Sequence, residues 1–168
     1  MGIIGAHNSA CTLAGLEVLN RYGVPMITPG SSAETVLTSG CEWISRAFPG
    51  DDLQCKALLN YIEENQDVDK IGVIYSNDDF GKGGLDSITE AAEEKGKEVV
   101  SESFANEDKD MTAQLSKLRD EGAEALFIWC QYTPGALIMK QARGLVWDVQ
   151  FYSGTGTIHE DTFSLSDG

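Results

Sequence analysis

The chain has 168 residues, of which 42% are hydrophobic, and its formal net charge is -15 at pH 7. This length suffices for one ordinary domain with a hydrophobic core. The acidic excess excludes nucleic acid as a partner, because a phosphate-binding surface needs clustered Lys and Arg. The same excess argues against an anionic membrane surface as a partner.

Short apolar strands alternate with amphipathic helices along the chain. The predicted strands span residues 2–5, 24–28, 71–75, 98–104, 125–130 and 150–153. The predicted helices span residues 12–22, 83–95, 110–121 and 133–145, and a further helix starts at Asp51 or Asp52, either of which can cap it. That helix is expected to bury the face formed by Leu53, Ala57, Leu58, Tyr61 and Ile62. This order predicts an α/β fold with three layers, in which helices cover both faces of a parallel sheet.

The alternation is broken at residues 40–50, which read as an extended segment crossing between two domains. We therefore expect an incomplete domain over residues 1–48 and most of an α/β domain over residues 49–168. The chain opens inside a strand, at Gly2-Ile3-Ile4-Gly5, with no lead-in and no basic and apolar leader. We expect it to be a fragment of a longer protein, whose signal for export lies outside these residues.

Polar loops follow five of the predicted strands, and they are rich in Ser, Thr, Gly and Asn. They span residues 6–11, 29–32, 76–80, 131–133 and 154–157. Ligands of open α/β sheets bind beyond the carboxyl ends of the strands, where backbone N–H groups and helix N-termini favour a carboxylate. Ser9, Ser32 and Asn77 suit caps and turns equally well, and Tyr75, Phe80 and Tyr132 suit packing on the sheet rim equally well.

No set of residues in the sequence indicates catalysis, a cofactor or a metal. His7 and His159 are the only histidines, and neither belongs to a catalytic motif. Gly154-Thr155-Gly156 lacks the third glycine of a dinucleotide site. The four cysteines have no zinc-site spacing and are expected to be free, buried thiols: Cys11, Cys41, Cys55 and Cys130.

Several segments taken together resemble, in order, the leucine/isoleucine/valine-binding branch of type I periplasmic binding proteins. They span residues 4–9, 23–32, 43–49, 71–83, 109–115, 125–129 and 140–145. The Arg-x-x-Pro-x-Asp pattern at Arg46–Asp51 is similar to the hinge segment that enters the second lobe of these proteins. The resemblance implies a periplasmic-binding-protein-like fold with flavodoxin-like lobes, here the end of lobe one and most of lobe two.

The resemblance also implies a ligand site between the lobes. Lobe one would contribute Ser9, Gly30, Ser31 and Ser32, and lobe two would contribute Phe80, Gln131 and Tyr132. Thr155 stands where the branched-chain amino acid binders have an acidic residue for the ligand's ammonium group. A charge-assisted partner is missing there, so the expected ligand is an amino acid or another small polar compound, such as a carboxylate or an amide.

By resemblance, the full-length protein is a secreted or lipid-anchored component of an ABC importer, located in the periplasm or outside the cytoplasmic membrane. It would close over a solute and dock to a membrane permease. An alternative from the same family is the ligand-sensing domain of a receptor or of a regulator of amide metabolism, and a third is a flavodoxin-like enzyme. The sheet edge that the missing strands leave open predicts pairing of two copies of the fragment as a homodimer.

Overall fold

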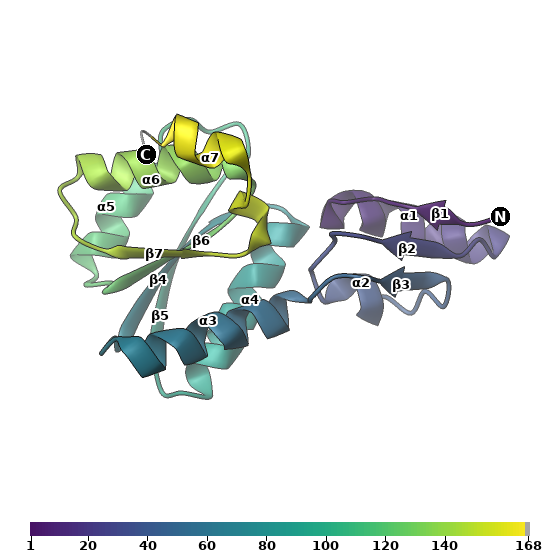
Figure 1. Cartoon of the computed structure of the whole chain (residues 1–168), viewed down its shortest axis with the longest axis horizontal. Coiled ribbons are helices and arrows are strands. Elements are labelled where there is room, and N and C mark those ends of the chain that lie inside the picture. The colour runs from purple at the N-terminus through teal and green to yellow at the C-terminus, as the bar shows by residue number, and fades with distance from the viewer. Residues whose placement is uncertain (167–168) are drawn as a thin grey trace.

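The computed structural model describes residues 1–166, which form two parallel β-sheets that lie end to end (Figure 1). The first sheet has the strand order β1-β2-β3. Its strands are β1 (Ile3–Ile4), β2 (Met26–Thr28) and β3 (Ile44–Arg46), and its helices are α1 (Ser9–Tyr22) and α2 (Thr35–Thr38). We call this part, up to Arg46, the N-terminal unit.

One face of the first sheet is packed and the other is open. Leu16 and Leu19 of α1 form a small core with Val36 of α2 and with Met26 from the sheet. On the opposite face Ile4 is 86% exposed and Ile27 is 49% exposed. Among the described residues, helices therefore cover this sheet on one face.

The second sheet has the order β5-β4-β6-β7, and all its strands are parallel. The strands are β4 (Lys70–Ser76), β5 (Glu98–Phe104), β6 (Ala125–Trp129) and β7 (Gln150–Ser153). The helices are α3 (Asp51–Asn65), α4 (Asp79–Glu93), α5 (Thr112–Asp120), α6 (Tyr132–Gly144) and α7 (Glu160–Leu165), with a 3₁₀ turn η1 (Thr155–Thr157). We call residues 51–166 the C-terminal unit.

Alternate residues of the central strands point to the two faces of the second sheet. Val73 and Phe127 pack with α3 and α4, whereas Ile74 and Ile128 pack with α5 and α6. Burial on both faces explains why these strands are apolar throughout rather than alternating. The predicted α/β class, with parallel sheets flanked by helices, is confirmed, and the second sheet has helices on both faces.

Two predicted helices begin earlier in the structure than in the sequence analysis. Helix α1 begins at Ser9, because the Asn8 side chain accepts a hydrogen bond from the Cys11 amide and caps the helix. Helix α4 begins at Asp79, because Asp78 caps it by accepting from the Gly81 amide at 2.9 Å. Short strand β3 and helices α2 and α7 were not predicted, because none of them is long enough for a periodic pattern.

The buried face of α3 matches the predicted one only in part: Ile62 is fully buried and Leu58 packs against the core. Leu53 and Tyr61 are 62% and 55% exposed, whereas Cys55 and Leu59 are fully buried. Asp51 is the first residue of the helix rather than its cap, which is Gly50. The prediction placed apolar residues on the buried face, whereas this face begins with a polar residue, Asp51, followed by Cys55 and Leu59.

All four cysteines are free thiols, and three of them are buried, as expected. Cys11 is exposed, so its predicted burial is wrong; it lies on the solvent side of α1. Within residues 1–166, no helix is long and apolar enough to cross a membrane.

A glycine in α4, Gly84, allows the helix to lie directly against the Trp129 side chain of β6. A methyl group built at Gly84 would lie 2.0 Å from Trp129 Cδ1, and the indole is fully buried. We predict that Gly84→Ala lowers the free energy of unfolding by about 1–3 kcal/mol through overpacking. The control is Gly15→Ala in α1, where nothing lies within 4 Å.

Helix propensity predicts that the control variant is more stable than the parent by up to about 1 kcal/mol. Urea unfolding of both variants measures the difference. Equal effects of the two substitutions would contradict the proposed contact between α4 and Trp129.

Candidate functional site

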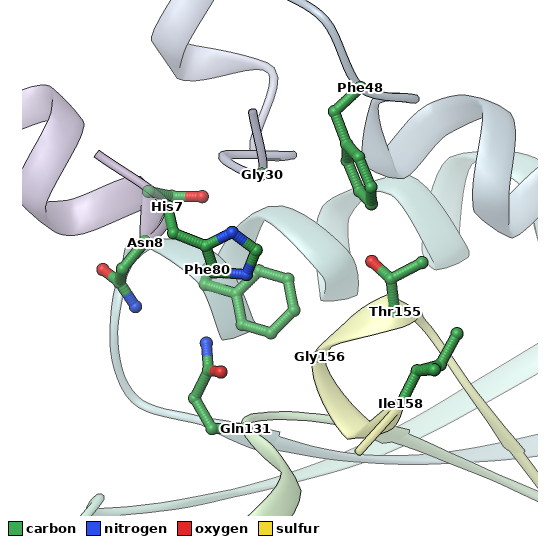
Figure 2. A pocket seen from close by; sticks show the side chains of 10 residues that line it. His7, Asn8, Gly30, Phe48, Phe80, Gln131, Thr155, Gly156 and Ile158 are labelled. Atoms are coloured by element: carbon green, nitrogen blue, oxygen red, sulfur yellow. The ribbon is translucent and has the colours of Figure 1, made fainter. Parts of the chain in front are cut away.

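A cavity of about 270 Å³ lies where the carboxyl ends of the strands of both sheets face each other (Figure 2). The N-terminal unit contributes the loop after β1, with His7, Asn8 and Ser9, and Gly30 after β2. Phe48 comes from the segment that connects β3 to α3. The cavity is thus bounded on one side by the N-terminal unit and by the connecting segment.

The C-terminal unit closes the other side of this cavity. Phe80 lies in the first turn of α4, Gln131 follows β6, and Thr155, Gly156 and Ile158 follow β7. In Figure 2 the Gln131 side chain points toward His7 and Asn8, and Phe80 lies behind the gap between them. Every strand except β5 is therefore followed by a residue that lines this cavity, which is the position expected for the ligand of a parallel α/β sheet.

The electrostatic character of the cavity favours an anion. Two helices start at its wall: Asn8 is the N-cap of α1, and Gln131 is the N-cap of α6 and makes no side-chain capping bond. The first N–H groups of a helix carry partial positive charge. Among the ten lining residues, all of them described, there is no Asp or Glu. The lining can offer amide, hydroxyl and imidazole groups beside an apolar wall of Phe48, Phe80 and Ile158.

Five of the eight predicted site residues line this cavity: Ser9, Gly30, Phe80, Gln131 and Thr155. Ser31 is instead fully buried behind it, where its hydroxyl lies 2.7 Å from the Thr12 hydroxyl. Ser32 is buried beside Asp51, and Tyr132 stacks on His159 with ring centroids 4.1 Å apart. The structure thus brings Ser9, Gly30, Phe80, Gln131 and Thr155 together, and it places Ser31, Ser32 and Tyr132 away from the cavity. A binding role for each of the eight residues stays a prediction.

The sequence analysis missed five lining residues: His7, Asn8, Phe48, Gly156 and Ile158. His7 and Asn8 lie in a predicted strand-end loop, so the loop itself was the available signal. Phe48 comes from the crossing segment, whose path toward the cavity follows from the unpredicted strand β3. No sequence signal marks Ile158, which is 77% exposed.

Two lining glycines are sites of close approach. A methyl group built at Gly30 would lie 2.1 Å from His7 Nδ1, so the imidazole rests directly on the Gly30 backbone. A methyl group built at Gly156 would lie 2.5 Å from the Cys130 carbonyl oxygen and 2.7 Å from Phe80 Cε1. A side chain at either position would displace a wall of the cavity.

Thr155 is held by a residue of α3. Gln54 Oε1 accepts hydrogen bonds from the Thr155 amide and from its hydroxyl, both at 3.1 Å, and Gln54 Nε2 donates to the Pro49 carbonyl. These bonds tie the loop after β7 to the start of α3 and to the connecting segment. The part of the cavity wall formed by Thr155 is therefore uncharged, and hydrogen bonds to Gln54 hold it in place.

A buried carboxyl group lies behind the cavity, at the junction of the two units. Asp51 is fully buried, and no well-formed hydrogen bond reaches its two oxygens, Ser32 Oγ or Trp129 Nε1, although the Ser32 hydroxyl and the Trp129 indole lie close enough to Asp51 to favour its anion. Burial raises the pKa of Asp51 from 3.8 to about 6. The Ser32 hydroxyl, Arg46 and the Trp129 indole partly oppose this rise in pKa.

A cavity between two parallel α/β units is typical of proteins that bind a small ligand between two lobes. A family model described as periplasmic binding protein matches residues 1–161, so the chain belongs to the periplasmic binding protein family. An amino acid binding protein of Pseudomonas aeruginosa is 27% identical over 169 residues, which cover 100% of this chain and 45% of that protein. The leucine-, isoleucine-, valine-, threonine- and alanine-binding protein of the same bacterium is 26% identical, over 98% of this chain and 44% of that protein.

Two solved structures show the same arrangement of elements. A leucine-binding protein from Thermotoga maritima superposes with a TM-score of 0.92 at 28% identity, over 98% of this chain and 47% of that chain. A branched-chain amino acid transporter substrate-binding protein from Streptococcus pneumoniae, solved with isoleucine, gives a TM-score of 0.84 at 27% identity over the same shares of the two chains. The chain spans about half the length of the relatives that it matches.

Asp51 predicts a pH dependence of stability. Because its pKa is higher in the folded chain, folding is most favoured while the carboxyl is neutral, and this contribution is lost as the pH rises from 3.8 to about 6. Asp51→Asn keeps the side chain neutral at every pH. We predict that the free energy of unfolding of this variant, relative to the parent, rises by about 2 kcal/mol between pH 4 and pH 8.

Urea unfolding at several pH values measures this change. Asp52→Asn, one residue further along α3 and half-buried, is the matched control and should show a smaller change. A difference between Asp51→Asn and the parent that does not vary with pH would contradict the assignment.

Proposed function

We propose that this chain is the ligand-capturing part of a solute-binding subunit of an ABC importer. Residues 1–48 would belong to one lobe and residues 49–168 to the other, with the ligand held between them. The observation that supports this most is the cavity itself, because loops from both sheets line it in a member of the periplasmic binding protein family. The proposed role is capture of a solute without catalysis.

The proposed ligand is an amino-acid-sized carboxylate. The helix N-termini at Asn8 and Gln131 favour its carboxylate, and the apolar wall at Phe48, Phe80 and Ile158 suits a short hydrocarbon side chain. Amino acids appear in the names of the relatives, which supports a ligand of this size. Since Thr155 is neutral and no lining residue is acidic, an ammonium group on the ligand is not required for binding.

The proposed partner is a membrane permease that recognises the closed form, and the proposed location of the full-length protein is outside the cytoplasmic membrane. Both proposals are supported by the family and by the name of one similar structure, a branched-chain amino acid transporter substrate-binding protein. The net charge of -15 is compatible with this role. The ligand would bind in the cavity and the permease would bind one face of the protein, and neither contact requires a basic surface.

A matched set of ligands tests the proposal: leucine, 4-methylpentanoate, which lacks only the amino group, and leucinamide, which lacks the carboxylate. We predict that 4-methylpentanoate binds at least as tightly as leucine, and that leucinamide binds more weakly than both. Isothermal titration calorimetry at up to millimolar ligand measures the three affinities. No detectable binding of any member of the set would contradict the proposed class of ligand.

The Gln131 side chain lines the cavity and points toward His7 and Asn8 on its opposite side, so it can donate a hydrogen bond to a ligand held there (Figure 2). Loss of one hydrogen bond to a charged group costs about 1.5–3 kcal/mol, so Gln131→Ala should weaken binding roughly tenfold or more. The matched control is Gln114→Ala in α5, which is also half-buried but does not line the cavity. Equal ligand affinities of the two variants would show that Gln131 does not bind the ligand.

A further inference from the structure

Three buried polar groups meet where the two units join, and we call Ser32, Asp51 and Trp129 the junction cluster. Ser32 belongs to the N-terminal unit, and its carbonyl oxygen accepts a hydrogen bond from the Asp51 amide at 3.0 Å. Trp129 ends β6 in the C-terminal unit. Each side chain has at least one buried polar atom without a well-formed hydrogen bond among the described residues, and the Ser32 hydroxyl and the Trp129 indole both lie close enough to the Asp51 carboxyl to favour its anion. Unpartnered polar groups in a protein interior are costly, so a cluster of them calls for an explanation.

The cluster is connected to both walls of the cavity. On the N-terminal side, Ser32 is two residues from Gly30, which lines the cavity and supports the His7 ring. On the C-terminal side, the Trp129 ring lies 6.2 Å from the ring of Phe80, between centroids. Trp129 also fills the space above Gly154, where an added methyl group would lie 2.7 Å from the indole, next to the lining residue Thr155.

The Asp51 carboxyl has no ion-pair partner, because the nearby cation, Arg46, pairs with Glu34. Arg46, from β3, donates to a Glu34 carboxylate oxygen at 2.8 Å and to the Ser32 carbonyl at 2.8 Å. Glu34 itself opposes a negative charge on Asp51. Asp52 and Cys55 are the neighbouring titratable groups on α3, and Asp51 faces the Gly83 backbone on α4. The burial of Asp51 is therefore not explained by an ion pair.

We propose that Asp51 is a positioning residue of the cavity: its buried carboxyl group joins the Ser32 loop of the N-terminal unit to Trp129 of the C-terminal unit and so couples the two walls. As an anion the carboxylate accepts from both the Ser32 hydroxyl and the Trp129 indole N–H after small rotations. As a neutral acid it donates its own proton to the Ser32 hydroxyl oxygen and can accept from the indole N–H only through its carbonyl oxygen, which is a weaker acceptor than a carboxylate. The two charge states thus favour different relative positions of the walls.

Any effect of Asp51 on ligand binding rests on the proposed binding function. The coupling of the two cavity walls through Asp51 does not. It is therefore tested without a ligand, so that its failure is distinguishable from failure of the binding proposal. Trp43→Phe and Trp147→Phe leave Trp129 as the only tryptophan of the chain. The readout is the Trp129 fluorescence emission between pH 4.5 and pH 8, with circular dichroism as the check of folding.

We expect one step in Trp129 emission with a midpoint near pH 6, the pKa of Asp51. Asp51→Asn should abolish the step while Arg46, Glu34, Asp52 and Cys55 all remain. Ser32→Ala, in the other unit, should raise the midpoint by roughly half to one pH unit, because a hydroxyl that favours the anion is removed. The matched control is Ser45→Ala, on the exposed side of β3, which should leave the midpoint unchanged.

Persistence of the step in Asp51→Asn would overturn the proposal, as would absence of a step in the chain that retains only Trp129. If Asp51→Asn does not fold, the Ser32→Ala arm decides by itself. A midpoint that Ser32→Ala and Ser45→Ala affect equally would show that Asp51 does not connect the two units.

Discussion

The right-handed crossover between parallel strands is the constraint on which the rest of this structure depends. It brings the carboxyl ends of all strands of one sheet to the same edge. Here the two sheets turn these edges toward each other (Figure 1). Residues that follow every strand except β5 therefore meet around one cavity. The position of the site is therefore set by chain topology, and its chemistry is set by the few residues that follow each strand.

Glycines at three positions allow the backbone to pack directly against the aromatic side chains near the cavity. Gly84 and Gly154 let α4 and the loop after β7 approach the two sides of the Trp129 indole, and Gly156 does the same at Phe80. The aromatic residues consequently have little freedom, and the wall that they form is rigid. Asp51 is the exception in this apolar packing, and its position at the junction is the reason to assign it a role in coupling the two units.

Much of the fold was predictable from the sequence, because buried parallel strands such as 71–75 and 125–130 are continuous apolar runs between helices. The five lining residues that were predicted from the family resemblance all lie in the polar loops that follow predicted strands. Phe48 and Ile158 escaped prediction because their neighbours, β3 and η1, are too short to give a pattern. Ser31 and Tyr132 were assigned to the site through the family resemblance, whereas in the structure they contact Thr12 and His159.

The central claim is that one ligand contacts both units at once. A titration of the isotopically labelled chain with 4-methylpentanoate, followed by the amide signals in NMR, tests it most directly. The account predicts that Ser9 and Gly30 of the N-terminal unit shift together with Gln131 and Gly156 of the C-terminal unit, with a single affinity. Shifts confined to one unit, with the other unchanged at saturation, would contradict it.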